Sequence, residues 1–495
     1  MRAIGFDNEA YLKLQSEKIK ERIASFGGKL YLELGGKLFD DYHASRVLPG
    51  FRPDSKIHML SELRDVAEVI IAINTADIEK NKVRGDLGIT YDQDVLRLID
   101  AFRAAGLFVG SVVMTQYRET SYADAFRSKL ENLGIKVYKH YSISGYPYNI
   151  PLINSEEGFG KNEYAETSRS LVIVTAPGPG SGKMATCLSQ IYHESRRGVK
   201  SGYAKFETFP VWNLSLSHPL NLAYEAATAD LNDLNMIDPF HLESYGVSTV
   251  NYNRDVEAFP ILRAILGGIL GECPYKSPTD MGVNMLGFCI VDEDVVAEAS
   301  KREILRRYYN ALCNKRKGMG SDLEIHKIEH LMQQLQITPA THRPAVPAAL
   351  ARAELTDGPA VAIELPDGRI ATGKTTPLLG AAAAALLNAL KMLADIGHDV
   401  DVISRRVLEP IQKLKTENLG NHNPRLHTDE VLIALAVSAA DSKKAARAMA
   451  VLPELCDAEV HSTVILSQAD TAVFRKLGLH LTSEPTYQTK KLFHI

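Results

Sequence analysis

Five short apolar segments, separated by stretches with helical spacing, are the feature that most constrains how this chain folds. The segments are KLYLEL (29–34), AEVIIAIN (67–74), LFVGSVVMT (107–115), IKVYKHY (135–141) and SLVIVTA (170–176). Their apolar runs are nearly continuous, which is typical of strands covered on both faces. Between them, residues such as 92–105 carry apolar side chains at helical spacing. The alternation predicts a doubly wound α/β domain over residues 1–215, with a mostly parallel sheet.

A helical middle region is expected at residues 216–340. Apolar residues recur at three and four spacing over 294–313 and again over 322–336. The stretch 338–352 is rich in Pro and Ala and is interpreted as a linker, which places a domain boundary near residue 340. A length of 495 residues also exceeds what one core usually holds, so several domains are expected.

The last part of the chain, residues 341–495, is expected to form a second, smaller α/β or α+β domain. The segment VAIEL-PDG-RIATG predicts a hairpin, because a turn tripeptide separates two apolar runs. Thr376-Pro377 then begins an alanine-rich helix, with Pro at a position that suits a helix start. Strands are predicted at 398–404 and 461–467, and helices near 428–440 and 470–476.

Composition excludes several classes of function. Lys and Arg number 56 against 60 Asp and Glu, and a net charge of -4 does not favour binding to nucleic acid. No apolar run approaches the roughly 18 residues that a membrane span needs, and no secretory signal is visible, so we expect a cytoplasmic protein without a membrane partner. The five cysteines have no C-x-x-C spacing, and neither zinc, haem nor flavin is indicated. Alanine-rich apolar helix faces suit a homo-oligomer and a core equally.

The main candidate site is the glycine loop, V-T-A-P-G-P-G-S-G-K-M-A-T at residues 174–186. Between a strand and a helix, the backbone N–H groups of such a loop and the helix N-terminus point at a bound anion. We predict that phosphate is bound by Gly178, Gly180, Ser181, Gly182, Lys183 and Thr186. The alternative is a tight turn with a solvated lysine.

The loop departs from the strict pattern G-x-x-x-x-G-K-[ST] at two places. Pro177 stands where the first glycine belongs, and Met184 stands where a hydroxyl would bind Mg²⁺. ATP and Mg²⁺ are the expected cofactors, with Thr186 or Asp238 as the residue that assists the metal; the metal ligand itself stays open. A second Gly-Lys-Thr, at 373–375, follows a hairpin strand, and we interpret it as the start of a helix.

Polar residues also follow the first two predicted strands. The carboxyl ends of parallel strands meet at one edge of a sheet, so these residues are expected to face the glycine loop. The substrate-binding candidates here are Gly36, Lys37, Asn74 and Asp77. Surface loops are polar in any case, which is the alternative explanation for each of them.

Two loop-like segments in the helical region, 234–243 and 275–284, are dense in groups that serve acid–base or phosphate chemistry. With Lys183, the catalytic candidates are Asp238, Lys276 and Asp280, and further substrate-binding candidates are Ser277 and Thr279. Helix capping and turn chemistry explain the same residues equally well. A third polar cluster, at 421–430, contains His422 and His427.

Three common enzyme signatures are absent from the sequence. It contains neither H-E-x-x-H nor G-x-S-x-G, which removes two common hydrolase signatures. It also has no early G-x-G-x-x-G after a strand, so a Rossmann dinucleotide site is not expected.

Four stretches together resemble a bacterial family catalogued as a domain of unknown function. They lie at 32–51, 176–190, 235–242 and 423–431, and the likeness covers essentially the whole chain. Some members carry the label ATP-dependent peptidase, against which the absent hydrolase motifs argue. The resemblance implies a multi-domain α/β architecture with a helical middle and a cytoplasmic bacterial protein, and it implies no reaction.

The residues therefore predict a nucleotide- or phosphate-binding enzyme that acts on a small anionic metabolite. Phosphoryl transfer, nucleotidyl transfer and ligation, as by an ATP-dependent transferase or ligase, all fit, because such reactions chiefly require positioning and charge neutralisation. The alternative is a non-catalytic protein that binds a phosphorylated metabolite or takes part in an assembly.

Overall fold

A computed structural model describes residues 3–84 and 87–489, and their contacts divide the chain into two compact units. The larger unit contains the described residues of 4–225 and 233–296. The second unit contains Ala3, residues 226–232 and the described residues from 297 on. The helical region expected at 216–340 is therefore shared between the two units.

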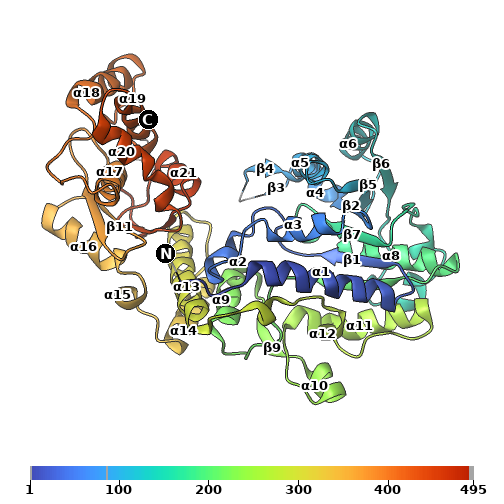
Figure 1. The fold of residues 1–495 in the computed structure, drawn as a ribbon. Coiled ribbons are helices and arrows are strands. Elements are labelled where there is room, and N and C mark those ends of the chain that lie inside the picture. Colours follow the sequence, from blue (N-terminus) through green and yellow to red (C-terminus); the bar gives the residue numbers. More distant parts are fainter. Residues whose placement is uncertain (1–2, 85–86, 490–495) are drawn as a thin grey trace. The chain divides into compact units, whose positions relative to one another are not determined.

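The larger unit is built around a six-stranded sheet whose strands are all parallel (Figure 1). In spatial order, the strands are β6 (Lys136–Lys139), β5 (Phe108–Thr115), β2 (Ala67–Asn74), β7 (Leu171–Thr175), β1 (Leu30–Leu34) and β8 (Gly202–Phe206). Every residue of β1, β2 and β7 is buried, as the continuous apolar runs require. The predicted doubly wound α/β fold is thus confirmed.

Helices pack around this sheet and continue into residues 233–296. They are α1 (Asn8–Ser25), α2 (Tyr42–Val47), α3 (Ser55–Glu62), α4 (Thr75–Glu79), α5 (Tyr91–Ala104), α6 (Ser121–Asn132), α7 (Ile150–Ile153), α8 (Lys183–Arg196), α9 (Pro219–Ala227), α10 (Pro239–Tyr245), α11 (Asn253–Leu270) and α12 (Pro278–Met281). Two small ribbons join β3 (Val83–Arg84) to β4 (Ile89–Thr90) and β9 (Asn235–Ile237) to β10 (Val250–Tyr252).

The connections that follow β7 and β2 run in opposite directions across the sheet. From β7 the chain passes through α8 to β8, whereas from β2 it passes through α4 and α5 to β5. Because such crossovers are right-handed, the two connections cover opposite faces. Figure 1 shows α4 and α5 on one side of the sheet and α11, which contacts α8, on the other. The neighbouring strands β2 and β7 therefore form a topological switch point, where open α/β sheets bind ligands.

The second unit contains a four-stranded mixed sheet. Its spatial order is β12 (Ile370–Lys374), β11 (Ala360–Glu364), β13 (Glu459–Ser462) and β14 (His480–Ser483). Its helices are α13 (Glu293–Arg316, whose first residues belong to the larger unit), α14 (Asp322–Gln334), α15 (Pro339–His342), α16 (Ala345–Thr356), α17 (Ala381–Leu393), α18 (Arg405–Lys413), α19 (Thr428–Ala439), α20 (Lys443–Ala450) and α21 (Gln468–Lys476). The predicted hairpin is β11 and β12.

Several expectations for this part of the chain were wrong. The stretch 338–352 is not a linker, because it contains α15 and most of α16. Pro347 lies in the first turn of α16, where the missing N–H costs no hydrogen bond, and the alanines favour a helix. Residues 398–404 form no strand; Val402 and Ile403 are instead buried in the core of the unit from a loop.

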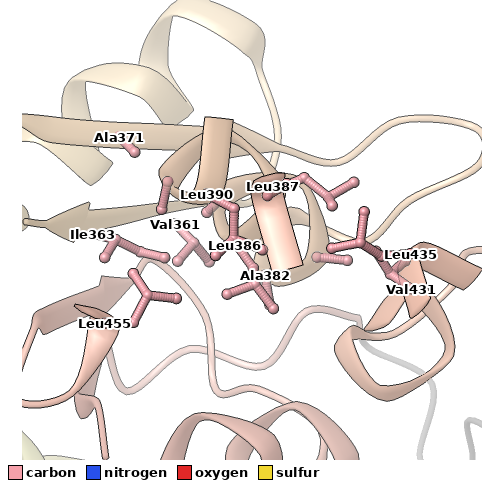
Figure 2. Close-up of a cluster of buried hydrophobic side chains, with 14 of the residues drawn as sticks. Val361, Ile363, Ala371, Ala382, Leu386, Leu387, Leu390, Val431, Leu435 and Leu455 are labelled. Atoms are coloured by element: carbon pink, nitrogen blue, oxygen red, sulfur yellow. The ribbon is translucent and has the colours of Figure 1, made fainter. Parts of the chain in front are cut away.

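The core of the second unit lies where α17 packs against β11 and β12 (Figure 2). A Cβ on Gly373 would lie 2.1 Å from the backbone nitrogen of Ala385, so only glycine lets the helix approach the strand this closely. The second Gly-Lys-Thr therefore lies at the end of a strand, and its glycine serves helix packing. The expectation that it is not a phosphate loop agrees with this arrangement. The expectation that this segment and Thr376-Pro377 begin a helix was wrong, because α17 begins at Ala381 with Gly380 as its N-cap.

Replacement of Leu386, fully buried at the centre of this core, is expected to destabilise the chain strongly. Leu386→Ala removes apolar contacts and leaves a cavity, which should lower the free energy of unfolding by about 2–5 kcal/mol. Urea unfolding followed by circular dichroism measures the change. The matched control is Leu355→Ala, because Leu355 is 77% exposed in α16 and its loss should cost below about 0.5 kcal/mol. Equal effects of the two variants would contradict the packing described.

Candidate functional site

The glycine loop connects β7 to α8 at the switch point of the sheet. Gly180 and Gly182 have φ angles of 77° and 85°, in the left-handed region that favours glycine. Alternation of left- and right-handed residues turns successive N–H groups toward one side, which makes a concave site for an anion. Gly182 is also the residue that precedes the first turn of α8.

The backbone N–H groups of residues 180–185 donate to no atom of the described residues. The next N–H, that of Thr186, donates to the carbonyl of Gly182 at 2.9 Å, and this is the first hydrogen bond of the regular helix. Lys183 follows the loop directly, and it forms no ion pair with any residue of 3–84 or 87–489. Six successive donors, a helix N-terminus and an unpaired ammonium group thus occur at one place, and all three favour an anion.

The carbonyl groups of the loop are held by the protein itself. Thr115, at the end of β5, donates its hydroxyl to the carbonyl of Ser181 at 2.8 Å. Asn74, at the end of β2, donates its side-chain amide to the carbonyl of Gly180 at 3.4 Å. The Ser181 hydroxyl donates to the carbonyl of Gly178 at 3.0 Å. Because the carbonyl groups are bound internally, the N–H groups are the polar groups left for a ligand.

These contacts indicate a positioning function for several predicted ligands. Ser181 is fully buried, and Asn74 also caps α4 by accepting from the N–H of Ala76 at 2.9 Å. Thr186 is fully buried, and its hydroxyl donates to the Gly182 carbonyl at 2.9 Å. Because the side chain is fully buried, the geometry offers no support for Thr186 as a residue that assists a metal.

The candidates after β1 and β2 lie at the same edge of the sheet as the loop. β1 and β2 both pair with β7, so Gly36 and Lys37 follow one neighbour of the loop strand and Asp77 follows the other. Gly36 has a φ of 71° and Lys37 is exposed. Asp77 lies in the first turn of α4, 3.2 Å from the ammonium of Lys82.

The segments 234–243 and 275–284 lie together, but farther along the sheet. Gly282 forms an isolated parallel bridge with Lys205 of β8, and β1 separates β8 from β7. Three strand spacings of about 4.8 Å give a separation of about 14 Å from β7. The structure therefore brings these two segments to each other, and it does not bring them to the glycine loop.

Asp238 and Asp280 both serve as helix caps. Asp238 is fully buried; it accepts from the N–H groups of Phe240 and His241, and from the N–H and hydroxyl of Thr279, the last at 2.6 Å. Asp280 forms a capping box with Ser277 at the start of α12. Capping, the alternative considered above, thus accounts for part of the hydrogen bonding of both carboxylates.

Lys276 places its ammonium 5.5 Å from the ring centre of Tyr245. Thr279 and Asp280 line a cavity of about 510 Å³ together with His241, Tyr245 and residues of α1. Catalytic roles for Asp238, Lys276 and Asp280, and substrate-binding roles for Ser277 and Thr279, stay predictions.

A buried group of charges at the ends of β1 and β8 was missed from the sequence. The Lys205 ammonium lies 2.7 Å from both carboxylate oxygens of Asp255 and 3.2 Å from Glu207. Glu33 accepts a hydrogen bond from the Tyr203 hydroxyl at 2.7 Å. A single charge inside an otherwise apolar strand, as in L-Y-L-E-L, was the available signal. Among the described residues, no group of three or more His, Cys, Asp or Glu could hold a metal ion.

The histidine cluster of the second unit stabilises a helix start. The Nδ1 atom of His427 lies 2.8 Å from Asp470, and this hydrogen bond raises the pKa of His427. Asp470 also accepts from the N–H of Thr428 at 2.9 Å, which ties the start of α19 to α21. His422 is exposed.

Comparison with known proteins covers nearly the whole chain. The sequence model described as domain of unknown function DUF1846, N-terminal, matches residues 4–336, and its C-terminal counterpart matches 341–493. The chain belongs to the DUF1846 family. The matches to the two DUF1846 models meet between residues 336 and 341.

Relatives of this family in Streptococcus pneumoniae are similar along their full length. Two proteins named UPF0371 protein, from strains JJA and CGSP14, are each 57% identical over 493 residues, which is 100% of this chain and 100% of theirs. Neither the family description nor these names state an activity. Among the described residues, none of the helices combines the length and apolar character needed to cross a membrane.

Gly182→Ala is expected to distort the glycine loop. The added Cβ would lie 2.9 Å from the Thr115 side chain, and the φ of 85° disfavours any L side chain. Left-handed strain and overpacking together should lower the free energy of unfolding by about 2–4 kcal/mol. In the control Gly180→Ala, nothing lies within 4 Å of the added Cβ, so only the strain of about 1 kcal/mol applies. Urea unfolding compares the two; an equal loss would refute the Thr115 contact.

Glu207 is expected to make stability depend on pH. Burial raises the pKa of Glu207 to about 7; Lys205 opposes this shift and Asp255 adds to it. Because the folded chain holds this proton more tightly than the unfolded chain, the stabilisation is complete below about pH 4.5 and is lost as the pH rises through about 7. Glu207→Gln should therefore reduce the loss of stability between pH 5 and 8.

Urea unfolding at several pH values measures this dependence. The exposed Glu21→Gln is the matched control and should leave the pH dependence of the parent unchanged. A Glu207→Gln variant whose stability falls with pH as steeply as the parent would show that Glu207 is not the titrating group.

Proposed function

We propose that the glycine loop binds a phosphate group, and that the chain is an enzyme of phosphoryl transfer, nucleotidyl transfer or ligation acting on a small anionic metabolite. One observation carries the proposal: the N–H groups of residues 180–185 have no acceptor among the described residues. Phosphate oxygens would satisfy these donors, which otherwise depend on solvent.

The surroundings of the loop support the same proposal. Lys183 has no carboxylate partner among the residues that the structure describes, so its charge is available to neutralise phosphate. The loop follows a strand at a switch point of the sheet, where ligands of open α/β folds bind. ATP with Mg²⁺ is the proposed cofactor. Neither Thr186 nor Asp238 is proposed as a metal ligand, because Thr186 is fully buried and Asp238 already accepts four hydrogen bonds.

A non-catalytic phosphate-binding or assembly protein is the second candidate. The observation that favours it is the residue after Lys183, because Met184 offers no hydroxyl to a metal. The same loop would then sense a phosphorylated metabolite without transferring its phosphate. The peptidase function is not proposed, because the sequence lacks the two common hydrolase motifs.

Lys183→Ala tests the proposal through ligand-dependent thermal stability. A ligand that binds only the folded chain raises the melting temperature, so ATP with Mg²⁺, ADP, pyrophosphate or phosphate should stabilise the parent by several degrees. The variant should lose most of this shift, because it lacks the ammonium group that faces the phosphate. The matched control is Lys374→Ala, which removes the lysine of the second Gly-Lys-Thr and should respond like the parent.

The pattern of ligands separates the two candidates. A shift that is largest with ATP and Mg²⁺, together with release of ADP or pyrophosphate, favours the enzyme. Equal shifts with all four ligands and no turnover favour the non-catalytic protein. If no phosphate compound changes the melting temperature, the loop does not bind phosphate and both are wrong.

A further inference from the structure

A cavity of about 510 Å³ in the larger unit is lined by α1, Trp212 and the segment 274–285. Its size falls in the range of sites for small molecules. The side chains that matter for its chemistry are Lys18, Arg22, Phe26, Trp212, Tyr245 and Asp280. The glycine loop contributes no residue to it.

Arg22 supplies a fixed positive charge to this cavity. Its guanidinium donates to the carbonyls of Asp280 at 2.7 Å and Gly282 at 3.3 Å, and it lies 5.7 Å from the ring centre of Tyr275. It forms no ion pair with any carboxylate of the described residues. Backbone carbonyls hold the side chain in place without cancelling its charge, so Arg22 is preorganised to bind an anion.

Lys18 adds a second cation from the same face of α1. Its partner is Glu21 at 2.9 Å, and both side chains are exposed, so this surface pair is weak and exchanges readily. A ligand carboxylate within the cavity would find both Lys18 and Arg22 on one wall.

Asp280 does not cancel these charges. Its Oδ2 atom accepts from the N–H groups of Lys276 and Ser277 and from the Tyr245 hydroxyl, at 2.9–3.2 Å. The carboxylate is thus turned toward the start of α12, where the backbone disperses its charge. The side chains that line the cavity carry a net positive charge.

Aromatic rings form the remaining walls. Phe26 and Tyr275 meet edge to face with ring centres 6.0 Å apart, and the Tyr245 ring lies 4.7 Å from that of His241. The Trp212 indole N–H already donates to the carbonyl of Asn284 at 2.8 Å, so the indole offers the cavity an apolar surface. Rings of this kind favour flat apolar ligands.

We propose that this cavity is a second binding site, separate from the glycine loop, for a small carboxylate carried on an aromatic ring. Arg22 and Lys18 hold the carboxylate, and Phe26, Trp212 and Tyr245 pack on the ring. The site does not depend on the phosphate-binding function proposed above.

The position of Trp212 makes this proposal testable directly. Trp212 is the single tryptophan of the chain and lines this cavity, so a change in tryptophan emission reports on binding next to it. Titration of the full chain with benzoate should change the emission in a saturable way. Cyclohexanecarboxylate keeps the charge without the aromatic ring, and benzylamine keeps the ring with the opposite charge; both should bind at least fivefold more weakly. Equal or stronger binding of either compound would overturn the proposed ligand class.

Two variants of α1 distinguish specific binding of benzoate in the cavity from a general effect of surface charge. Lys18→Gln should weaken benzoate binding at least fivefold, whereas the control Lys20→Gln, at an exposed position that does not line the cavity, should bind like the parent. Circular dichroism confirms that both variants fold. Lys183→Ala should leave benzoate binding unchanged, which keeps this result distinct from that of the glycine loop. No saturable response in the parent, or equal binding by the Lys18→Gln and Lys20→Gln variants, would refute the site.

Discussion

The pairing of β7 between β1 and β2 is the constraint on which the rest of the larger unit depends. All five residues of β7 are buried, and after Thr175 the chain turns through the glycine loop to begin α8 at Lys183. The connection after β7 runs toward β8, whereas those after its neighbours β1 and β2 run the other way across the sheet. Because crossovers are right-handed, the connections after β1 and β2 lie on the face opposite to the one that follows β7. The glycine loop consequently lies between two diverging connections, where its N–H groups meet solvent and any ligand.

The strands of this sheet could be predicted because their signal is local. AEVIIAIN coincides with β2, and SLVIVTA contains β7, since an apolar run is enough to specify a buried strand. β8 was missed because G-Y-A-K-F has a charge and no continuous run, and its place beside β1 is set by distant parts of the chain. α16 was mistaken for a linker because its prolines suggested a break, although the first turn of a helix accepts proline.

The candidate site was predictable in its residues and not in their contacts. The letters of the glycine loop indicate an anion site, but Thr115 and Asn74, which bind its carbonyl groups, lie 66 and 106 residues earlier in the chain. Asp238 and Asp280 are residues of a type that serves in catalysis, and in the fold both carboxylates cap helix starts. Glu33 and Lys205 show the converse, because each is a single charge inside a strand, and the two become neighbours only when β1 and β8 pair.

The two glycine-lysine pairs of the chain show why a motif needs its backbone context. At Gly373 the missing Cβ lets the backbone of Ala385 approach closely. This glycine lies in an antiparallel strand, where it pairs with Val361 of β11. At Gly182 the missing Cβ admits the side chain of Thr115, and the left-handed backbone turns the following N–H groups away from the sheet. In both places glycine permits a close approach. Only at Gly182 does that approach leave donors without acceptors, and such donors are what a phosphate requires.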